Sequence, residues 1–261
     1  MQRVTTFLRS LLYLLLLIVS VAPWSFVVLG AYLAPVRTRY WLCTRWTRFA
    51  IQAARRVCGI RWRVEGWDNL PDGPAIVLPK HQSAWETLWL PSFLPRPLTF
   101  VYKRELNRVP FFGWGIASLH MINIDRRRGQ DAFEQVVAQG IEHLRDGWWI
   151  VIFPEGTRTP PGSTRRYKTG GVRLAVRTGT PVVPIAVNSG ELWPRKAFLK
   201  KPGEITVVSG KPIPTAGKSV DEVGAQVEAW IEIEMRRLAP HRYTGPYASV
   251  RNRHASSVAQ P

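Results

Sequence analysis

The stretch from Ala75 to Glu86 reads AIVLPKHQSAWE and contains the change of pattern that decides the fold. Its first residues are apolar and suit a buried strand, its middle is polar, and a helix-like run follows. Six other short runs have strand character. They are Trp62–Glu65, Leu98–Tyr102, Met121–Ile124, Trp148–Phe153, Val182–Val187 and Glu204–Ser209.

Helical patterns alternate with these strands. Apolar residues keep helical spacing from Phe133 to Leu144, and Gly147 suits the stop after that helix. Further helices are predicted over 169–178 and over 220–238, the second ending before Pro240. Alternation of this kind predicts an α/β fold, with a mixed, largely parallel sheet flanked by helices.

The length of 261 residues bounds the chain to one domain of ordinary size, or to one domain plus a membrane-interacting appendage. We expect N-terminal membrane-associated helices over 1–59, an α/β domain over 60–240 and a basic flexible tail over 241–261. The content of 46% hydrophobic and 21% charged residues excludes a disordered or fibrous chain. Because Cys43 and Cys58 are the only cysteines, a disulfide framework and a cysteine-built metal site are also excluded.

The N-terminal segment has no charged residue between Arg9 and Arg37. As one helix the intervening run would be about 40 Å long, enough to cross a hydrocarbon core of about 30 Å. Pro23 lies at its centre and is expected to kink the helix or to split it. Split halves would be too short to cross and would favour a re-entrant hairpin. A cleavable signal peptide is disfavoured, because the run is too long and no small-x-small site follows it.

The next segment, 38–59, has the pattern of an amphipathic helix. One face is an apolar stripe of Leu42, Trp46, Phe49, Ala53 and Val57, and the other is made of Arg45, Arg48, Gln52, Arg55 and Arg56. Such a helix suits a bilayer surface. The alternative is an ordinary core-packing helix with a solvated basic face.

The chain is strongly basic, with 36 Lys and Arg against 18 Asp and Glu, for a formal net charge of +18. A charge of this size favours anionic partners such as an anionic phospholipid membrane, nucleic acid or a phosphorylated ligand. More arginines follow the apolar run than precede it. For an apolar run that spans the membrane, the positive-inside bias predicts that the rest of the chain lies in the cytoplasm, at the inner membrane.

His81 is the candidate catalytic residue, since it stands where a strand gives way to a helix. Glu86 follows about one and a half turns later, so its carboxylate can fold back and orient the imidazole. A histidine held in this way is a general base near neutral pH. On its own such a pair is more often structural than catalytic.

The loop after the strand at 148–153 carries the second candidate group. A tight turn is expected there, made of Glu155, Gly156, Thr157 and Arg158. From this turn the Arg158 guanidinium can bind a phosphate through two hydrogen bonds. The alternative is a turn with a solvated arginine. Lys103 and Arg126 stand at the ends of two further strands and are candidates for the same phosphate.

Four ordered blocks give the chain a resemblance to the glycerolipid acyltransferase family. They are His81–Glu86, Lys103 through Pro110 to Gly113, Phe153–Thr159 and Val183–Val187. The first block differs from the family pattern, which has Asp where this chain has Glu86. Glutamate is one methylene longer, so the orienting role requires a helix that starts slightly farther from His81.

The resemblance implies transfer of a fatty acyl group from an acyl thioester, acyl-CoA or acyl carrier protein, to lysophosphatidic acid, giving phosphatidic acid for phospholipid biosynthesis. His81 and Glu86 would be catalytic, and Lys103, Arg126, Glu155, Gly156, Thr157 and Arg158 would bind the substrate. Glu155 would accept a bond from a substrate hydroxyl or hold one of the cations. No metal or redox cofactor is implied.

Other functions fit the sequence less well. Another lysolipid acceptor would keep the same His81 chemistry. A membrane-tethered basic nucleic-acid-binding protein is the alternative from a different class, but no base-reading helix or stacking-sheet motif is recognised, so no nucleic-acid partner is expected. The chain contains no Gly-x-Ser-x-Gly motif, which argues against a lipid hydrolase. An inactive relative is disfavoured by the intact run from Glu155 to Arg158.

Overall fold

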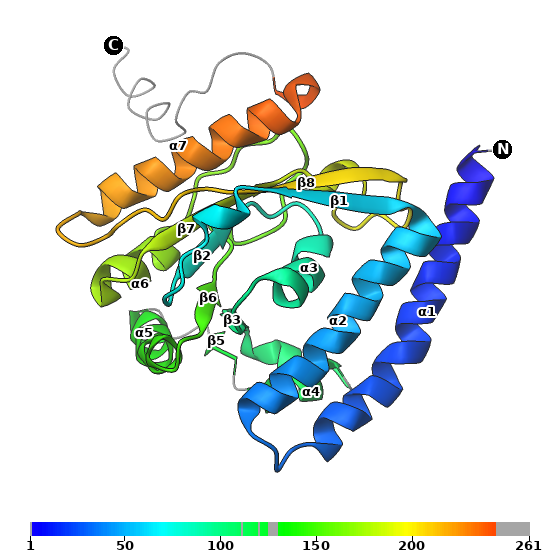
Figure 1. Cartoon of the computed structure of the whole chain (residues 1–261), viewed down its shortest axis with the longest axis horizontal. Helices are drawn as coiled ribbons and strands as arrows, with labels where there is room; N and C mark the ends of the chain where they lie inside the picture. Colours follow the sequence, from blue (N-terminus) through cyan, green and yellow to red (C-terminus); the bar gives the residue numbers. More distant parts are fainter. Residues whose placement is uncertain (1, 111, 120, 125–129, 244–261) are drawn as a thin grey trace. The chain divides into compact units, whose positions relative to one another are not determined.

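The structure, a computed structural model, describes residues 2–110, 112–119, 121–124 and 130–243 (Figure 1). Its helices are α1 (Gln2–Gly30), α2 (Val36–Cys58), α3 (Trp85–Phe93), α4 (Phe112–Ser118), α5 (Gln130–Arg145), α6 (Gly170–Thr178) and α7 (Val220–Leu238). Its strands are β1 (Ile60–Glu65), β2 (Ile76–Pro79), β3 (Leu98–Phe100), β4 (Tyr102–Lys103), β5 (Asn123–Ile124), β6 (Trp149–Val151), β7 (Val182–Val187) and β8 (Gly203–Ser209).

Within the described part of the chain, six strands form one sheet in the order β1-β8-β7-β2-β6-β3. β2 pairs with β7 in parallel and β7 pairs with β8 in antiparallel orientation. Every residue of β2 and β7 is buried, as expected for central strands covered on both faces. β4 and β5 form a separate parallel pair. The predicted α/β class with a mixed, largely parallel sheet is confirmed.

The predicted element boundaries are correct for β7 and α7 and wrong around residue 101. The run from Leu98 to Tyr102 was expected to be one strand, but β3 ends at Phe100 and β4 starts at Tyr102. The backbone N–H of Tyr102 donates to the carbonyl of Ile122 at 3.0 Å. This bond directs the chain into the small β4-β5 sheet, so a single apolar run supplies strands to two sheets.

α1 is one continuous helix of 29 residues that contains Pro23, so the predicted split is wrong. It ends at Gly30, before the end of the apolar run at Val36. Next to the proline, the Trp24 indole Nε1 donates to the carbonyl of Leu42 in α2 at 2.8 Å. α2 thus holds α1 close to the point where proline removes a helical hydrogen bond. By length and composition α1 can cross a membrane, and only 17% of its most apolar window is buried.

The chain forms two compact units, each built from separated segments. The first is Met1–Arg61, Ala84–Ile150 and Lys196–Glu204; the second is Trp62–Ser83, Val151–Arg195 and Ile205–Pro261. The division into functional regions at 1–59, 60–240 and 241–261 stays a prediction, and residues 244–261 of the expected tail lie outside the described residues.

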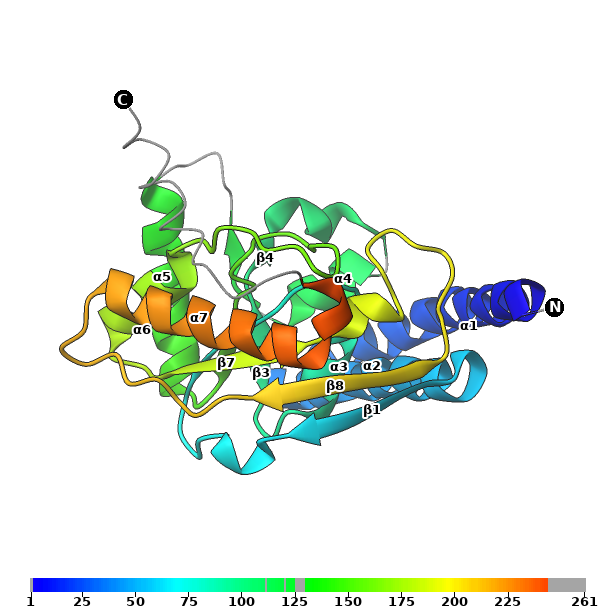
Figure 2. The same cartoon turned by 90° about the horizontal axis from the view of Figure 1, so that it is seen from above.

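In the first unit α2 packs against α1, α3 and α4, and α1 and α2 lie side by side (Figures 1 and 2). The buried side chains of α2 include Tyr40, Thr44, Thr47, Ile51, Ala54 and Cys58. Of the predicted apolar stripe, Ala53 is buried as well, whereas Phe49 is 43% exposed. Close contact with several helices favours small and hydroxyl side chains on the buried face, and the expected role of the apolar stripe at a bilayer surface stays a prediction.

In the second unit α7 covers β7 (Figure 2), and α6 packs on β2. Val223, Val227, Ile231 and Met235 are buried at four-residue spacing and form the apolar face of α7. In α6, a Cβ at Gly171 would lie 2.7 Å from Cδ2 of Leu78. Glycine at this position therefore lets α6 approach the strand that leads to His81.

The start of α7 yields a prediction about stability. The Ser219 hydroxyl accepts the backbone N–H of Glu222 at 3.2 Å, and the Glu222 carboxylate accepts the backbone N–H of Ser219 at 2.7 Å. Ser219→Ala should lower the free energy of unfolding by about 1 kcal/mol, because one helix N–H loses its acceptor. Urea unfolding monitored by circular dichroism measures the change. Ser219→Asn keeps an acceptor and should stay close to the unsubstituted protein; equal losses in both variants would contradict the capping role.

Candidate active site

His81 lies directly beyond the carboxyl end of β2, in the second unit. The backbone N–H of Lys80 donates to the carbonyl of Ile185 at 2.8 Å and extends the pairing of β2 with β7 by one residue. His81 is the next residue and is half-buried. The strand therefore fixes the position at which the histidine leaves the sheet, as predicted from the sequence.

The loop after β6 binds both backbone polar groups of His81. The His81 N–H donates to Oε2 of Glu155 at 3.0 Å. The His81 carbonyl accepts the backbone N–H of Thr159 at 2.8 Å and the Thr159 hydroxyl at 3.2 Å. Residues 153–159 thus hold His81 from both sides, so two of the sequence blocks meet here.

The imidazole of His81 stacks on the ring of Phe153, with 3.7 Å between ring centroids and 18° between ring planes. Stacking covers one face of the imidazole and restricts rotation about its second side-chain torsion. The two nitrogens lie at the edge of the ring, so the same contact orients them. The loop after β6 therefore sets the position of the histidine backbone and the plane of its ring.

The turn at Gly156 requires glycine. Its φ is +66°, a left-handed conformation that other residues rarely adopt, and a Cβ would lie 2.9 Å from Cε of Lys168. The turn is closed by the Gly156 N–H, which donates to the Phe153 carbonyl at 3.0 Å. Thr157 and Arg158 follow and are half-buried. Arg158 thus precedes Thr159, the residue that binds the His81 carbonyl.

Glu155 has a different environment from the one expected. Its side chain is 0% exposed, and Oε1 lies 3.0 Å from Nζ of Lys80 while also accepting the Thr159 hydroxyl at 3.3 Å. Its other oxygen accepts the His81 N–H. These contacts support a positioning role toward His81 in place of the expected contact with a substrate hydroxyl.

The remaining predicted site residues lie elsewhere in the chain. Glu86 is the second residue of α3 and is buried; it belongs to the first unit, so its pairing with His81 stays a prediction. Lys103 ends β4, also in the first unit, in register with Ile124 of β5. Arg126 lies outside the described residues. The shared phosphate role of Lys103, Arg126 and Arg158 stays a prediction.

Sequence reasoning missed three residues that contact His81 or Glu155. In the sequence, Phe153 and Thr159 are only the two ends of a block. In the structure Phe153 stacks on the His81 ring and Thr159 binds the His81 carbonyl. Lys80 was treated as part of the polar segment, yet it is completely buried. A lysine placed directly after a fully apolar strand was the available signal that a buried carboxylate must lie near it.

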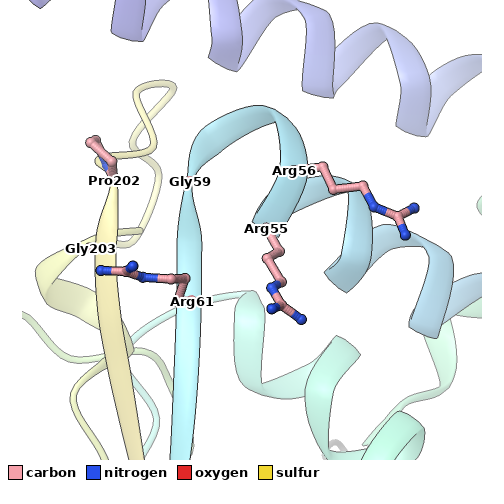
Figure 3. Close-up of a pocket in the computed structure, with 6 residues that line it drawn as sticks. All are labelled: Arg55, Arg56, Gly59, Arg61, Pro202 and Gly203. Carbon is pink, nitrogen blue, oxygen red and sulfur yellow. The ribbon is translucent and has the colours of Figure 1, made fainter.

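A separate cationic pocket lies in the first unit at the end of α2. It is lined by Arg55, Arg56, Gly59, Arg61, Pro202 and Gly203. In Figure 3 the side chains of Arg56 and Arg61 point away from each other, so the arginines do not form a single phosphate clamp. Among the described residues, no group of three or more His, Cys, Asp or Glu is placed to hold a metal ion.

Comparison with known proteins shows that the chain is similar to acyltransferases. A family model described as Acyltransferase matches residues 61–188. The chain is 42% identical over 252 residues to the 1-acyl-sn-glycerol-3-phosphate acyltransferase of Pseudomonas aeruginosa, covering 93% of this chain and 97% of that protein. It is 32% identical over 169 residues to the human 1-acyl-sn-glycerol-3-phosphate acyltransferase alpha, covering 64% of this chain and 60% of that protein.

The fold is similar to a solved structure. The crystal structure of the 1-acyl-sn-glycerophosphate (LPA) acyltransferase PlsC from Thermotoga maritima matches with a TM-score of 0.76 and 23% sequence identity. The match covers 95% of this chain and all of that chain. The similarity therefore includes the N-terminal helices, which lie outside the family model.

The turn at Gly156 yields a second prediction. Gly156→Ala should lower the free energy of unfolding by about 1 to 2 kcal/mol, because alanine must adopt a left-handed conformation against the Lys168 side chain. The matched control is Gly170→Ala in α6, where a Cβ meets nothing within 4 Å. Thermal unfolding of both variants measures the difference. Equal midpoints would show that the turn at Gly156 does not need glycine.

Proposed function

Because the chain belongs to the acyltransferase family, we propose that it transfers a fatty acyl group from an acyl thioester to the sn-2 hydroxyl of 1-acyl-sn-glycerol 3-phosphate. The product is phosphatidic acid, an intermediate of phospholipid biosynthesis. The observation that carries the proposal is the attachment of His81, through both its backbone groups, to the loop that contains Arg158. The proposed general base, His81, and the proposed phosphate-binding residue, Arg158, are thereby held by one short loop.

His81 acts as the general base in this mechanism. Its imidazole takes the proton of the acceptor hydroxyl as the hydroxyl oxygen attacks the thioester carbonyl. The tetrahedral intermediate then collapses, the carbon–sulfur bond breaks, and the leaving thiolate takes the proton from the imidazolium. Glu86 orients the imidazole and stabilises its protonated form. The product ester and the free thiol account for all atoms.

Arg158 is the principal ligand of the acceptor phosphate. A guanidinium forms two parallel hydrogen bonds with phosphate oxygens, which fixes the orientation of the bound molecule as well as its position. Gly156 and Thr157 offer a backbone amide and a hydroxyl in the same turn. Lys103 and Arg126 add positive charge toward the dianionic headgroup. Glu155 serves this site through the His81 backbone.

The surface of the first unit supports a membrane location for the reaction. Large apolar side chains of α1 are exposed, and they include Val4, Leu8, Ile18, Val19 and Phe26. Exposed apolar surface of this extent is typical of a lipid-facing helix. We infer that α1 and the basic helix α2 attach the enzyme to the anionic inner membrane, with the catalytic residues on the cytoplasmic side. The acceptor then reaches the site without leaving the bilayer.

The function is tested with the purified full-length chain in detergent or in phospholipid vesicles. Acyl-CoA and acyl carrier protein thioesters are each offered with a small panel of lysolipids, and products are identified by mass. Phosphatidic acid from lysophosphatidic acid is the expected product. A product formed only from a different lysolipid would replace the acceptor in the proposal, and absence of any ester product would contradict acyl transfer.

His81→Ala should reduce kcat about 100- to 10,000-fold, since the base that takes the hydroxyl proton is lost. Initial rates of phosphatidic acid formation measure the loss. His241 provides a control in the same unit, because it is exposed and pairs with Glu191 at 2.9 Å. His241→Ala should retain ordinary turnover. Near-normal turnover in His81→Ala would eliminate the assignment of the base.

Arg158→Ala should raise the KM for lysophosphatidic acid about 10- to 100-fold, which corresponds to the loss of charge-assisted hydrogen bonds to the phosphate. The KM for the acyl donor should change little. Arg158→Lys keeps the charge without the two-pronged geometry and should lie between the alanine variant and the native enzyme. An effect confined to the acyl donor would contradict the placement of the phosphate.

A further inference from the structure

A buried charged cluster connects the active-site loop to α7. Lys80 is 0% exposed, and its Nζ lies 3.0 Å from Oε1 of Glu155 and 2.6 Å from Oε1 of Glu232. Glu232 is 1% exposed and belongs to α7. The Tyr167 hydroxyl donates to the same Glu232 oxygen at 3.0 Å. The lysine beside His81 is therefore held by two carboxylates from different parts of the chain.

The charges in this cluster balance. Lys80 and Arg236 supply two positive charges, and Arg236 Nη1 lies 3.5 Å from Oε2 of Glu232. Glu155 and Glu232 supply two negative charges. Burial alone would lower the pKa of Lys80, but the two carboxylates outweigh burial and raise it above its ordinary value. Lys80 is thus a buried ammonium whose position depends on both partners.

The cluster reaches His81 through Glu155. One oxygen of Glu155 contacts the Lys80 ammonium and the other accepts the His81 backbone N–H. A shift of the ammonium toward Glu155 rotates this carboxylate and weakens its bond to His81. Glu232 opposes that shift, because it attracts the ammonium from the α7 side at the shorter distance.

We propose that Glu232 is a positioning residue for His81. Glu232 acts through Lys80 and Glu155 and does not touch the substrate. The inference rests on the proposed acyl transfer and adds to it a residue of α7, outside the range 61–188 that the family model matches. The Tyr167 hydroxyl also holds Glu232 in place. Burial and the nearby carboxylates raise the pKa of this phenol, so it stays protonated and donates its hydrogen bond to Glu232.

The test is Glu232→Gln in the full-length enzyme, assayed by phosphatidic acid formation. The amide keeps the shape of the side chain and removes its charge, so Lys80 is left with Glu155 as its nearest carboxylate. We expect kcat to fall roughly 10- to 100-fold, as small displacements of a catalytic group do. The KM values for acceptor and donor should stay within about twofold, because no substrate contact is removed.

Glu234→Gln is the control on the same helix, since Glu234 lies two residues later on α7 and pairs with Arg237 at 2.7 Å. Its kcat should stay within about twofold of the native value, whatever its unfolding temperature. Both variants are assayed well below their unfolding midpoints. A lower midpoint with unchanged kcat in Glu232→Gln would overturn the inference, as would equal losses of kcat in both variants.

Tyr167→Phe gives the same test with a milder change, and it replaces Glu232→Gln should the latter not fold. It removes the hydroxyl that donates to Glu232 and leaves every charge in place. We expect a smaller fall in kcat at constant KM; an unchanged kcat would contradict the chain of contacts. Absence of phosphatidic acid from the native enzyme would instead contradict the acyl transfer itself.

Discussion

A lysine ammonium sealed inside a protein is stable only where carboxylates surround it, and this constraint organises the second unit. Lys80 at the end of β2 contacts Glu155 in the loop after β6 and Glu232 on α7. Removing either acid would leave an uncompensated charge in the interior. The end of β2, the loop after β6 and α7 must therefore be in place together. The His81 backbone N–H donates to Glu155, so the position of this histidine depends on the ion cluster.

Much of the fold could be predicted from local patterns. β7 has the predicted bounds because it is a continuous apolar run, and α7 because it is a run of helical period that begins with a capping residue and ends before Pro240. The errors arose where tertiary contacts decide. Pro23 does not split α1, which is bonded to α2 through Trp24, and the run at 98–102 is divided between two sheets. Neither effect has a signature within a short window of sequence.

The candidate active site could likewise be predicted only in part. The sequence predicted that His81 and the loop at 153–159 each follow the end of a strand, and the structure joins them through both backbone polar groups of His81. It did not predict that Glu155 faces inward, because a carboxylate in a basic loop suggests a solvent-exposed ligand. Glu232 was hidden by its distance from the motifs along the chain, since α7 follows β8 in the sequence and reaches the site by packing on β7.

The first unit is assembled from segments made at very different times. The Ser10 hydroxyl of α1 accepts the backbone N–H of Lys200, 190 positions later in the chain. At a synthesis rate of about 5–20 residues per second, roughly 10 to 40 seconds separate the two residues as they leave the ribosome. During that interval α1 is present without one of its protein partners. A helix this apolar would need other partners during that interval, so under the proposed membrane attachment its insertion into lipid would precede the folding of the rest of the enzyme.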